Sequence, residues 1–125
     1  MGGGSTIACA LFQPEMKLIV ANAGDSHVVL CRNDKSHCLS ETHNTTNIKE
    51  RERIESEGGS IINNRVCGTH QVTRGLGDYR LKKHIIAKPY MIEIDIQESD
   101  KYLILGSDGV SSILLTHLNK ILILI

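Results

Sequence analysis

Short apolar runs follow one another closely in the first third of the chain, with polar turns between them. The runs cover residues 6–12, 17–23 and 27–31 and, more weakly, 36–39. The turns between them are Gln13-Pro14-Glu15, Gly24-Asp25 and Asn33-Asp34-Lys35, which are residue types that favour turns. Because too few residues intervene for crossover helices, the pattern predicts an antiparallel meander in which neighbouring strands pair.

The pattern then changes to a charge-dense segment that is typical of a short surface helix over residues 48–57. Asn47 is a suitable N-cap with Glu50 three residues later, and Gly58-Gly59 ends the helix. Two i,i+4 ion pairs are expected on it, Arg51 with Glu55 and Arg53 with Glu57. Such pairs contribute only about 0.3 kcal/mol each, so we expect the charges of this helix to face solvent rather than bind a ligand.

Residues 65–82 are too glycine-rich for a regular helix and too long for a simple turn, so we expect an ordered, functional loop. Arg74, Asp78 and Lys82 recur in it at four-residue intervals. This spacing is consistent with an internal ion-pair network and equally with a basic rim that meets phosphate. Strand signals flank the loop at residues 60–63, 85–86 and 91–96.

Two aspartates follow buried-strand patterns. Leu103-Ile104-Leu105 is followed by Gly106-Ser107-Asp108-Gly109, and the run over residues 17–23 is followed by Gly24-Asp25-Ser26. The glycine beside each acid permits a tight backbone and leaves room for an ion. We therefore predict that Asp25 and Asp108 meet in space and share a hard cation, because such cations prefer carboxylate oxygens.

Composition excludes several functional classes. Lys plus Arg and Asp plus Glu both number 14, and only Phe12 and three tyrosines are aromatic, so neither charge nor stacking surface favours nucleic acid. No run reaches the roughly eighteen apolar residues of a membrane span.

The four cysteines have no paired spacing, which predicts reduced, mostly buried thiols in an intracellular protein, cytoplasmic or nuclear. The six histidines show no metal-ligand spacing, and we expect a monomer.

Seven motifs occur in an order and at spacings that resemble those of the metal-dependent protein serine/threonine phosphatases of the PPM (type 2C) family. They are Gly-Gly-Ser-Thr at the start, Val-Ala-Asn-Ala-Gly-Asp-Ser ending at Ser26, Glu50-x-x-Arg53-Ile54-x-x-x-Gly58-Gly59, Arg65-Val-x-Gly68, Val72-Thr73-Arg74-x-x-Gly77-Asp78-x-x-Leu81-Lys82, Ala87-Lys88-Pro89 and Leu103-Ile104-Leu105-x-Ser107-Asp108-Gly109. Together they cover nearly the whole chain, and no single motif would suffice.

This resemblance implies an α+β fold, a β-sandwich of two antiparallel sheets flanked by helices, which is incomplete in this chain. It implies two Mg²⁺ or Mn²⁺ ions and a phosphoprotein substrate, in which phosphoserine and phosphothreonine are hydrolysed by metal-activated water without a phospho-enzyme. Asp108 matches the family's aspartate that ligates a catalytic metal. Asp25 matches the Gly-Asp-Ser aspartate, which is associated with an additional, weaker metal. Arg74 and Asp78 match a segment that we interpret as mainly structural, and we assign no catalytic residue.

The chain also departs from the family pattern. The family's first metal-binding blocks should precede Gly-Gly-Ser-Thr, and its final Asp-Asn motif should follow Asp108, so residues 1–125 are expected to form a partial phosphatase domain that is inactive alone. Ser111 and Ser112 stand where the family has an aromatic residue and an aspartate. Two hypotheses stay open: part of a working phosphatase, or an inactive relative that serves as a binding module.

Overall fold

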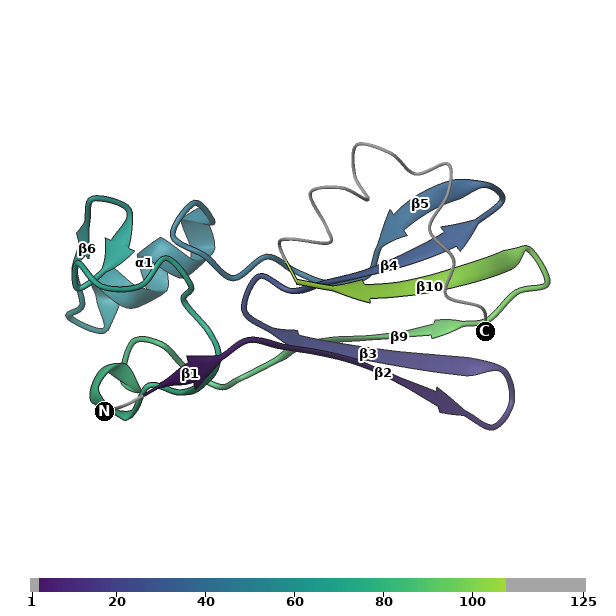
Figure 1. Ribbon diagram of the computed structural model, residues 1–125, viewed down its shortest axis with the longest axis horizontal. Coiled ribbons are helices and arrows are strands. Elements are labelled where there is room, and N and C mark those ends of the chain that lie inside the picture. The colour runs from purple at the N-terminus through teal and green to yellow at the C-terminus, as the bar shows by residue number, and fades with distance from the viewer. Residues whose placement is uncertain (1–2, 108–125) are drawn as a thin grey trace. The chain divides into compact units, whose positions relative to one another are not determined.

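The computed structural model describes residues 3–107, which divide into two compact units (Figure 1). We call the first the loop unit; it contains residues 3–7, Ala23–Asp25 and Thr42–Pro89. The second is the sandwich unit, which contains Ala8–Asn22, Ser26–Glu41 and residues 90–107. Each unit has its own apolar cluster, so each is described separately.

The sandwich unit consists of two three-stranded sheets. One has the order β2-β3-β9 and the other β10-β4-β5. The strands are β2 (Ile7–Gln13), β3 (Lys17–Ala23), β4 (His27–Arg32), β5 (Lys35–Cys38), β9 (Tyr90–Asp95) and β10 (Asp100–Gly106). The pairs β3–β9, β4–β5 and β10–β4 are antiparallel. The predicted antiparallel β-sandwich is thereby confirmed.

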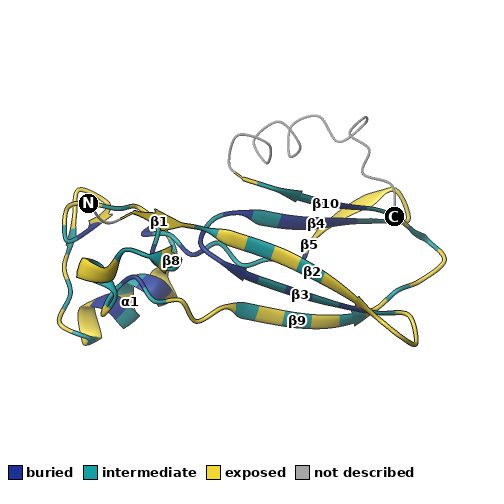
Figure 2. Cartoon of the chain, turned by 60° about the horizontal axis from the view of Figure 1, so that its bottom comes forward, coloured by how far each residue is buried: buried dark blue, intermediate teal, exposed yellow. Residues whose placement is uncertain are grey.

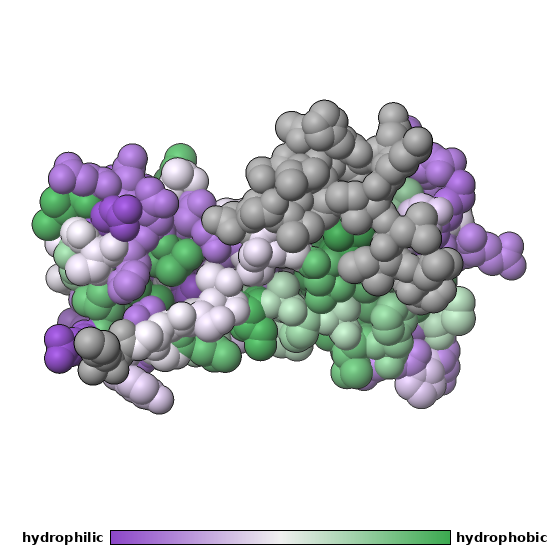
Figure 3. Space-filling view, viewed as in Figure 1, coloured by the Kyte–Doolittle hydropathy of each residue, from purple (hydrophilic) through white to green (hydrophobic). Residues whose placement is uncertain are grey.

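Alternation along the strands creates the core between the sheets. Leu18 and Val20 of β3 and Val28 and Leu30 of β4 are buried, and Leu103 of β10 packs with them. The intervening residues of β2 and β9 are more exposed, which gives the alternating bands in Figure 2. In Figure 3 the apolar residues gather over these strands. Period-two alternation in the sequence therefore reports which side of each sheet faces the core.

Tight turns with two residues at positive φ join several neighbouring strands. Glu15 and Met16 (φ 64° and 58°) connect β2 to β3, and Asn33 and Asp34 (φ 52° and 59°) connect β4 to β5. Two successive positive φ values are typical of the type I′ turn, whose twist matches that of a hairpin. Asn and Asp suit this conformation, whereas Glu and Met adopt it only because the flanking strands impose it.

The predicted pairing of β3 with β4 is wrong, because these consecutive strands belong to different sheets. The reason lies in Gly24 between them. Its carbonyl accepts a hydrogen bond from the His43 N–H at 3.0 Å, so the connection is tied to the loop unit instead of closing a hairpin. The meander is therefore interrupted at Gly24-Asp25.

The pairing of β4 with β10 is fixed by a charged clamp at one end. Nε and Nη2 of Arg32 donate to the two carboxylate oxygens of Asp100 at 2.6 and 2.9 Å. The hydrogen bond from Arg32 lowers the pKa of Asp100. From this clamp, after an irregularity between Asp100 and Tyr102, the register runs to Gly106 opposite His27. The end of β10 is therefore aligned with the start of β4.

The loop unit contains the short elements. They are β1 (Gly4–Ser5), α1 (Ile48–Ser56), β6 (Ile61–Ile62), β7 (Arg65–Val66), β8 (Leu76–Gly77) and the 3₁₀ turn η1 (Tyr79–Leu81). Asn47 caps α1 by accepting from the Lys49 N–H, as predicted. Ile54, Val66 and Ile85 form the buried cluster. The strand expected at residues 85–86 is reduced to a single β-bridge of Ile86 with Arg74, while the side chain of Ile85 belongs to this cluster.

The cysteines differ from the prediction in burial. All four are unpaired, but Cys9 and Cys38 are exposed and Cys31 and Cys67 are only half-buried. Cys9 alternates with Ala8 and Ala10, which pack on the core, and Cys38 lies in the exposed edge strand β5. Within residues 3–107 we find no helix with the length and apolar character needed to cross a bilayer.

The core assignment predicts unequal effects for two leucine truncations. Leu18→Ala should lower the free energy of unfolding by about 2–5 kcal/mol, because Leu18 is fully buried. Leu11→Ala on neighbouring β2, where the side chain is 58% exposed, should change it by less than about 0.5 kcal/mol. Urea unfolding followed by circular dichroism measures both, and equal losses would contradict the assignment.

Candidate functional site

Asp25 follows a backbone segment that is held from within the loop unit. Gly24 lies between buried Ala23 and half-exposed Asp25, and its peptide groups face His43, which is fully buried. The His43 N–H donates to the Gly24 carbonyl, and the Gly24 nitrogen lies 3.3 Å from Nδ1 of His43. Two contacts to one histidine therefore fix the peptide that leads into Asp25.

Gly24 is required at this position for two reasons. Its φ of +115° is rarely adopted by residues with a side chain, and a Cβ would collide with the side chain of Thr6. It would also lie 3.2 Å from the carbonyl oxygen of Arg74. The glycine thus allows Thr6, the segment at Arg74 and the segment before Asp25 to approach one another closely.

Asp108, the second predicted metal ligand, lies outside the described residues. What the structure does give is the register of the strands that lead to both acids. β4 begins two residues after Asp25, β10 ends two residues before Asp108, and Gly106 is paired with His27. That the two carboxylates meet stays a prediction, as does the role of each as a metal ligand.

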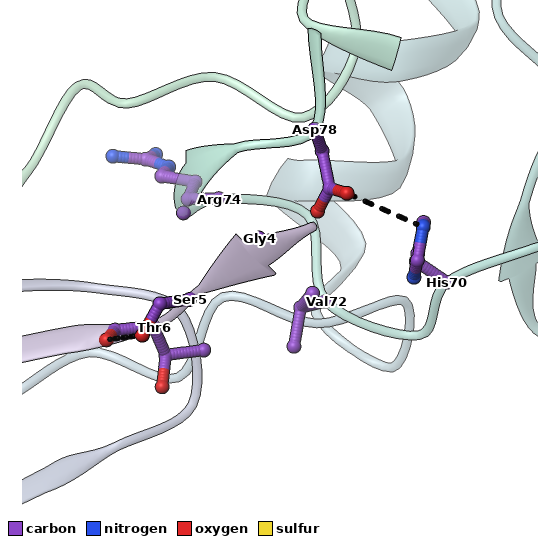
Figure 4. A pocket seen from close by; sticks show the side chains of 8 residues that line it. Gly4, Ser5, Thr6, His70, Val72, Arg74 and Asp78 are labelled. Atoms are coloured by element: carbon purple, nitrogen blue, oxygen red, sulfur yellow. Dashed lines mark hydrogen bonds and ion pairs between the residues drawn. The ribbon is translucent and has the colours of Figure 1, made fainter. Parts of the chain in front are cut away.

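The long loop over residues 65–82 is ordered and lines a cavity of about 130 Å³ (Figure 4). Its lining residues are Gly4, Ser5, Thr6, His70, Val72, Arg74, Gly75 and Asp78. β1 pairs with β8 beside it, with Gly4 opposite Gly77. The cavity therefore lies where the Gly-Gly-Ser-Thr segment meets the loop.

Asp78 is directed into this cavity rather than toward solvent. Its Oδ1 lies 3.7 Å from Nε2 of His70, and Figure 4 shows the two side chains pointing toward each other. Asp78 has a left-handed backbone (φ 49°), and a Cβ on Gly4 would collide with its carboxylate. Gly4 therefore leaves the space that the Asp78 carboxylate occupies.

Glu50 is the centre of a buried ion-pair network. Its carboxylate accepts from Nη2 and Nε of Arg74 at 2.6 and 3.1 Å, from the Thr73 hydroxyl at 2.8 Å and from Nη2 of Arg53 at 3.2 Å. Arg53 also donates to the carbonyls of Thr73 and His84. The network connects α1 to Thr73 and Arg74 in the middle of the loop that lines the cavity and to His84 just after its end.

The pKa of Glu50 reflects this environment. Burial alone would raise it, because a desolvated carboxylate is costly. Hydrogen bonds from Arg74 and Thr73, with the positive charges of Arg74 and Arg53, overcome that effect and lower the pKa of Glu50 to about 2. Glu50 is therefore ionised in the folded chain at neutral pH.

These contacts correct two predictions about charge. Glu50 does not face solvent, because its carboxylate is engaged by Arg74, Thr73 and Arg53. Of the expected i,i+4 pairs, Arg53 with Glu57 forms at 3.1 Å, whereas the guanidinium of Arg51 donates to the Thr45 carbonyl.

The four-residue spacing of Arg74, Asp78 and Lys82 does not produce ion pairs among these three residues in the described structure. Arg74 binds Glu50, Asp78 faces His70, and the Lys82 ammonium donates to the Gly75 carbonyl. Of the two interpretations left open by the sequence, the structure supports the internal network, with Glu50 as the acid. Arg74 is thereby neutralised and does not form a free basic rim.

Metal-binding capacity is limited in this part of the chain. Residues 3–107 contain no group of three or more His, Cys, Asp or Glu side chains that could hold a metal ion. Asp25 is a suitable oxygen donor for Mg²⁺ or Mn²⁺, but a single carboxylate does not form a two-metal centre. The described residues therefore do not fit such a centre by themselves.

Sequence reasoning missed two positioning residues, His43 and Glu50. His43 shares no metal-ligand spacing with the other histidines, but it stands where the phosphatase family that the sequence resembles has the histidine of a His-Lys-Pro turn, followed here by Asn44-Thr45. Glu50 was assigned to a capping box, although it stands three residues before Arg53 in a family motif. In both cases the motif position was the available signal, and local charge patterning obscured it.

Comparison with known proteins gives a consistent result. The family described as "Protein phosphatase 2C" matches residues 1–116 of the chain. "Probable protein phosphatase 2C 78" of Arabidopsis thaliana is 42% identical over 109 residues, which are 85% of this chain and 26% of that protein. "Protein phosphatase 2C homolog 1" of Saccharomyces cerevisiae is 40% identical over 99 residues, 79% of this chain and 35% of that protein.

Solved structures show the same fold. A structure titled "Structure of a C.elegans sex determining protein" matches with a TM-score of 0.84 and 29% identity over 88% of this chain and 28% of its own. Serine-threonine phosphatase 2C from Toxoplasma gondii matches with a TM-score of 0.78 and 20% identity, over 88% of this chain and 43% of its own. The chain thus spans between about a quarter and less than half of the lengths of these similar proteins.

The Glu50 network predicts a pH-dependent loss of stability. Glu50→Gln should lower the free energy of unfolding at neutral pH by about 3 kcal/mol. The pKa of Glu50 falls from about 4.5 in the unfolded chain to about 2 in the folded chain, and this difference stabilises the folded state at every pH above about 4.5. That contribution is lost as the pH falls from about 4.5 to about 2, so the difference between variant and wild type should shrink over this window. Denaturant unfolding across the pH range measures it, with exposed Glu52→Gln as control. A pH-independent difference would contradict the assignment.

Proposed function

The chain belongs to the protein phosphatase 2C family, and we propose that it forms the central part of a metal-dependent protein serine/threonine phosphatase. The substrate is a phosphoprotein, whose phosphoserine and phosphothreonine are hydrolysed. The cofactors are Mg²⁺ or Mn²⁺, two in the complete site. Asp25 and Asp108 are the metal ligands that this stretch supplies.

One observation carries the assignment of the two acids, the pairing of β4 with β10. Gly106 lies opposite His27, so the strand ends that lead to Asp25 and Asp108 are adjacent in one sheet. Residues that lie just beyond aligned strand ends have short, restrained connections, which suits ligands that must be held at fixed separation. Gly24, fixed by His43, restrains the connection to Asp25 further.

In a complete centre the divalent ions would supply a more acidic water molecule and would stabilise charge on phosphate oxygens. The part that this chain plays is to hold carboxylates. Asp25 is half-exposed on a rigid backbone, so its oxygens are accessible to an ion without unfolding of the segment. The Glu50 network keeps Thr73 and Arg74 in place within the loop that lines the cavity.

A second function, that of an inactive relative used as a binding module, is favoured by a specific feature. Ser111 and Ser112 replace the aromatic residue and aspartate that the family has after Asp108-Gly109. Loss of an acid next to a metal ligand removes negative charge where cations would bind. In either case we propose an intracellular protein, cytoplasmic or nuclear, because four unpaired cysteines suit a reducing compartment.

We expect residues 1–125 alone to show no Mn²⁺-dependent hydrolysis of a phosphopeptide, because two carboxylates do not complete a two-metal site. Mn²⁺ should nevertheless bind weakly, with a Kd on the order of 1 mM, as expected for a site with few charged ligands. Paramagnetic broadening of the amide signals of His27 and Gly106 reports the binding. Asp25→Asn together with Asp108→Asn should abolish it. Micromolar affinity, or broadening that the double variant keeps, would overturn the ligand assignment.

A chimera tests the phosphatase function itself. This chain would replace the matching segment of the yeast relative, which then supplies the parts that the chain does not contain. If the chain is part of a working enzyme, a folded chimera should hydrolyse phosphopeptide with Mn²⁺, and Asp108→Ala should lower kcat at least about a hundredfold, a typical cost of losing a group that stabilises the transition state.

The same chimera separates the two candidate functions. A folded but inactive chimera that regains activity on Ser112→Asp would favour the inactive relative and refute the enzyme. Circular dichroism and the melting temperature show whether each chimera is folded.

A further inference from the structure

A basic segment overlaps the end of the loop that lines the cavity. Residues 79–88 contain Arg80, Lys82, Lys83 and Lys88 and no Asp or Glu. The loop unit to which they belong has more Lys and Arg than Asp and Glu, whereas the whole chain is neutral. The positive charge is therefore concentrated locally, and composition alone does not reveal it.

Backbone hydrogen bonds in and after the 3₁₀ turn η1 hold the chain from Asp78 to Ile85. The Leu81 N–H donates to the Asp78 carbonyl, and the Ile85 and His84 N–H groups donate to the Leu81 carbonyl. Leu81 packs against the buried cluster of Ile54, Val66 and Ile85. Arg80 lies within η1 and Lys83 lies two residues after its end, and both residues are exposed.

The charges of Arg80 and Lys83 are available to a partner. Both side chains belong to exposed residues, and neither forms a salt bridge with any acid in the described part of the chain. Asp78, the acid nearest in sequence, is turned into the cavity toward His70 (Figure 4). Lys82, in contrast, is used internally by the Gly75 carbonyl. The two cations are thus neither neutralised nor held by the fold.

An exposed aromatic residue adjoins the two cations. Tyr79 is 85% exposed, the largest value among the exposed large hydrophobic residues, and Leu76 three positions earlier is 46% exposed. Tyrosine and arginine are enriched where proteins bind one another, because each combines contact area with directional hydrogen bonding. We call Tyr79, Arg80 and Lys83 the Tyr79 surface.

We propose that the Tyr79 surface binds an acidic stretch of the phosphoprotein substrate, an inference that rests on the proposed function and names a feature of its substrate. Asp and Glu of that stretch pair with Arg80 and Lys83, and its apolar groups contact the Tyr79 ring. A polypeptide fits better than nucleic acid, because a single exposed tyrosine offers no series of stacking positions along a strand. Substrate selection thus uses charge outside the metal centre.

Binding of labelled peptides to the 125-residue chain tests the proposal. The probes are an acidic peptide with one phosphoserine, its unphosphorylated form and a neutral peptide of the same length. Fluorescence anisotropy should show binding of both acidic forms and not of the neutral one. Affinity should fall as salt approaches about 0.15 M, where charges are screened beyond roughly 8 Å.

A charge-reversal variant assigns the binding to this surface. Arg80→Glu together with Lys83→Glu should weaken acidic peptide binding about tenfold or more, since each exposed pair contributes modestly. The matched control, Lys35→Glu together with Lys49→Glu, makes the same change of charge at two exposed lysines elsewhere and should bind like wild type. Tyr79→Ala should weaken binding without changing its salt dependence. Circular dichroism checks that the variants are folded.

Several results would overturn the proposal. One is the absence of acidic peptide binding, and another is equal weakening by the control variant. A third is that a single-stranded oligonucleotide of equal charge binds more tightly than the acidic peptide and that the Arg80/Lys83 variant abolishes this binding. That result would assign the surface to nucleic acid. The binding test includes an unphosphorylated peptide, which cannot be hydrolysed. Its outcome therefore does not depend on whether the chimera is active. Acidic peptide binding beside an inactive chimera would refute the phosphatase function alone.

Discussion

The pairing of β4 with β10 is the constraint on which the candidate site depends. Register in an antiparallel pair has a period of two, so a slip by one residue would turn Val28, Leu30 and Leu103 out of the core. Burial of these side chains therefore selects one register at one end, and the bidentate Arg32–Asp100 pair secures it at the other. Because both devices agree, Gly106 at the end of β10 is held opposite His27 at the start of β4. The contacts that stabilise the sandwich are thus the same contacts that align the strand ends next to the proposed ligands.

The loop unit is organised by a different kind of interaction, since its apolar cluster is small. Glu50 accepts from Arg74, Thr73 and Arg53, so a single carboxylate joins α1 to the segment that lines the cavity. A buried charge is costly unless it is fully paired, and the lowered pKa of Glu50 shows that the pairing outweighs the cost. Such a network specifies geometry more strictly than apolar contacts do, because each donor must lie in one direction. The ion pairs of Glu50 therefore keep the glycine-rich loop over residues 65–82 in one conformation.

Prediction from the sequence succeeded where one residue pattern determined one structure. Apolar runs bounded by turn residues located β2, β3, β4 and β9, and Asn47 with Gly58-Gly59 located α1. It failed where a distant residue decided the outcome: His43 diverts the connection after β3, and Arg74 draws Glu50 inward. Neither partner can be identified from spacing along the chain. For the candidate site, the segments that carry Asp25 and Asp108 could be predicted, whereas the supporting residues could not, because their contacts join positions about twenty apart.

The charge of the proposed centre limits what these residues can do alone. Two divalent cations bring four positive charges, and Asp25 and Asp108 return two, so the remaining ligands would be water molecules, which leave the ions exchangeable. A tight centre needs further carboxylates, and within residues 3–107 none stands near enough to Asp25 to form a group of three donors. Three of the acids in these residues are already engaged: Glu50 by two arginines, Asp100 by Arg32 and Asp78 opposite His70. These carboxylates hold the fold together, whereas Asp25 belongs to none of these ion pairs and suits an ion that other ligands must help to bind.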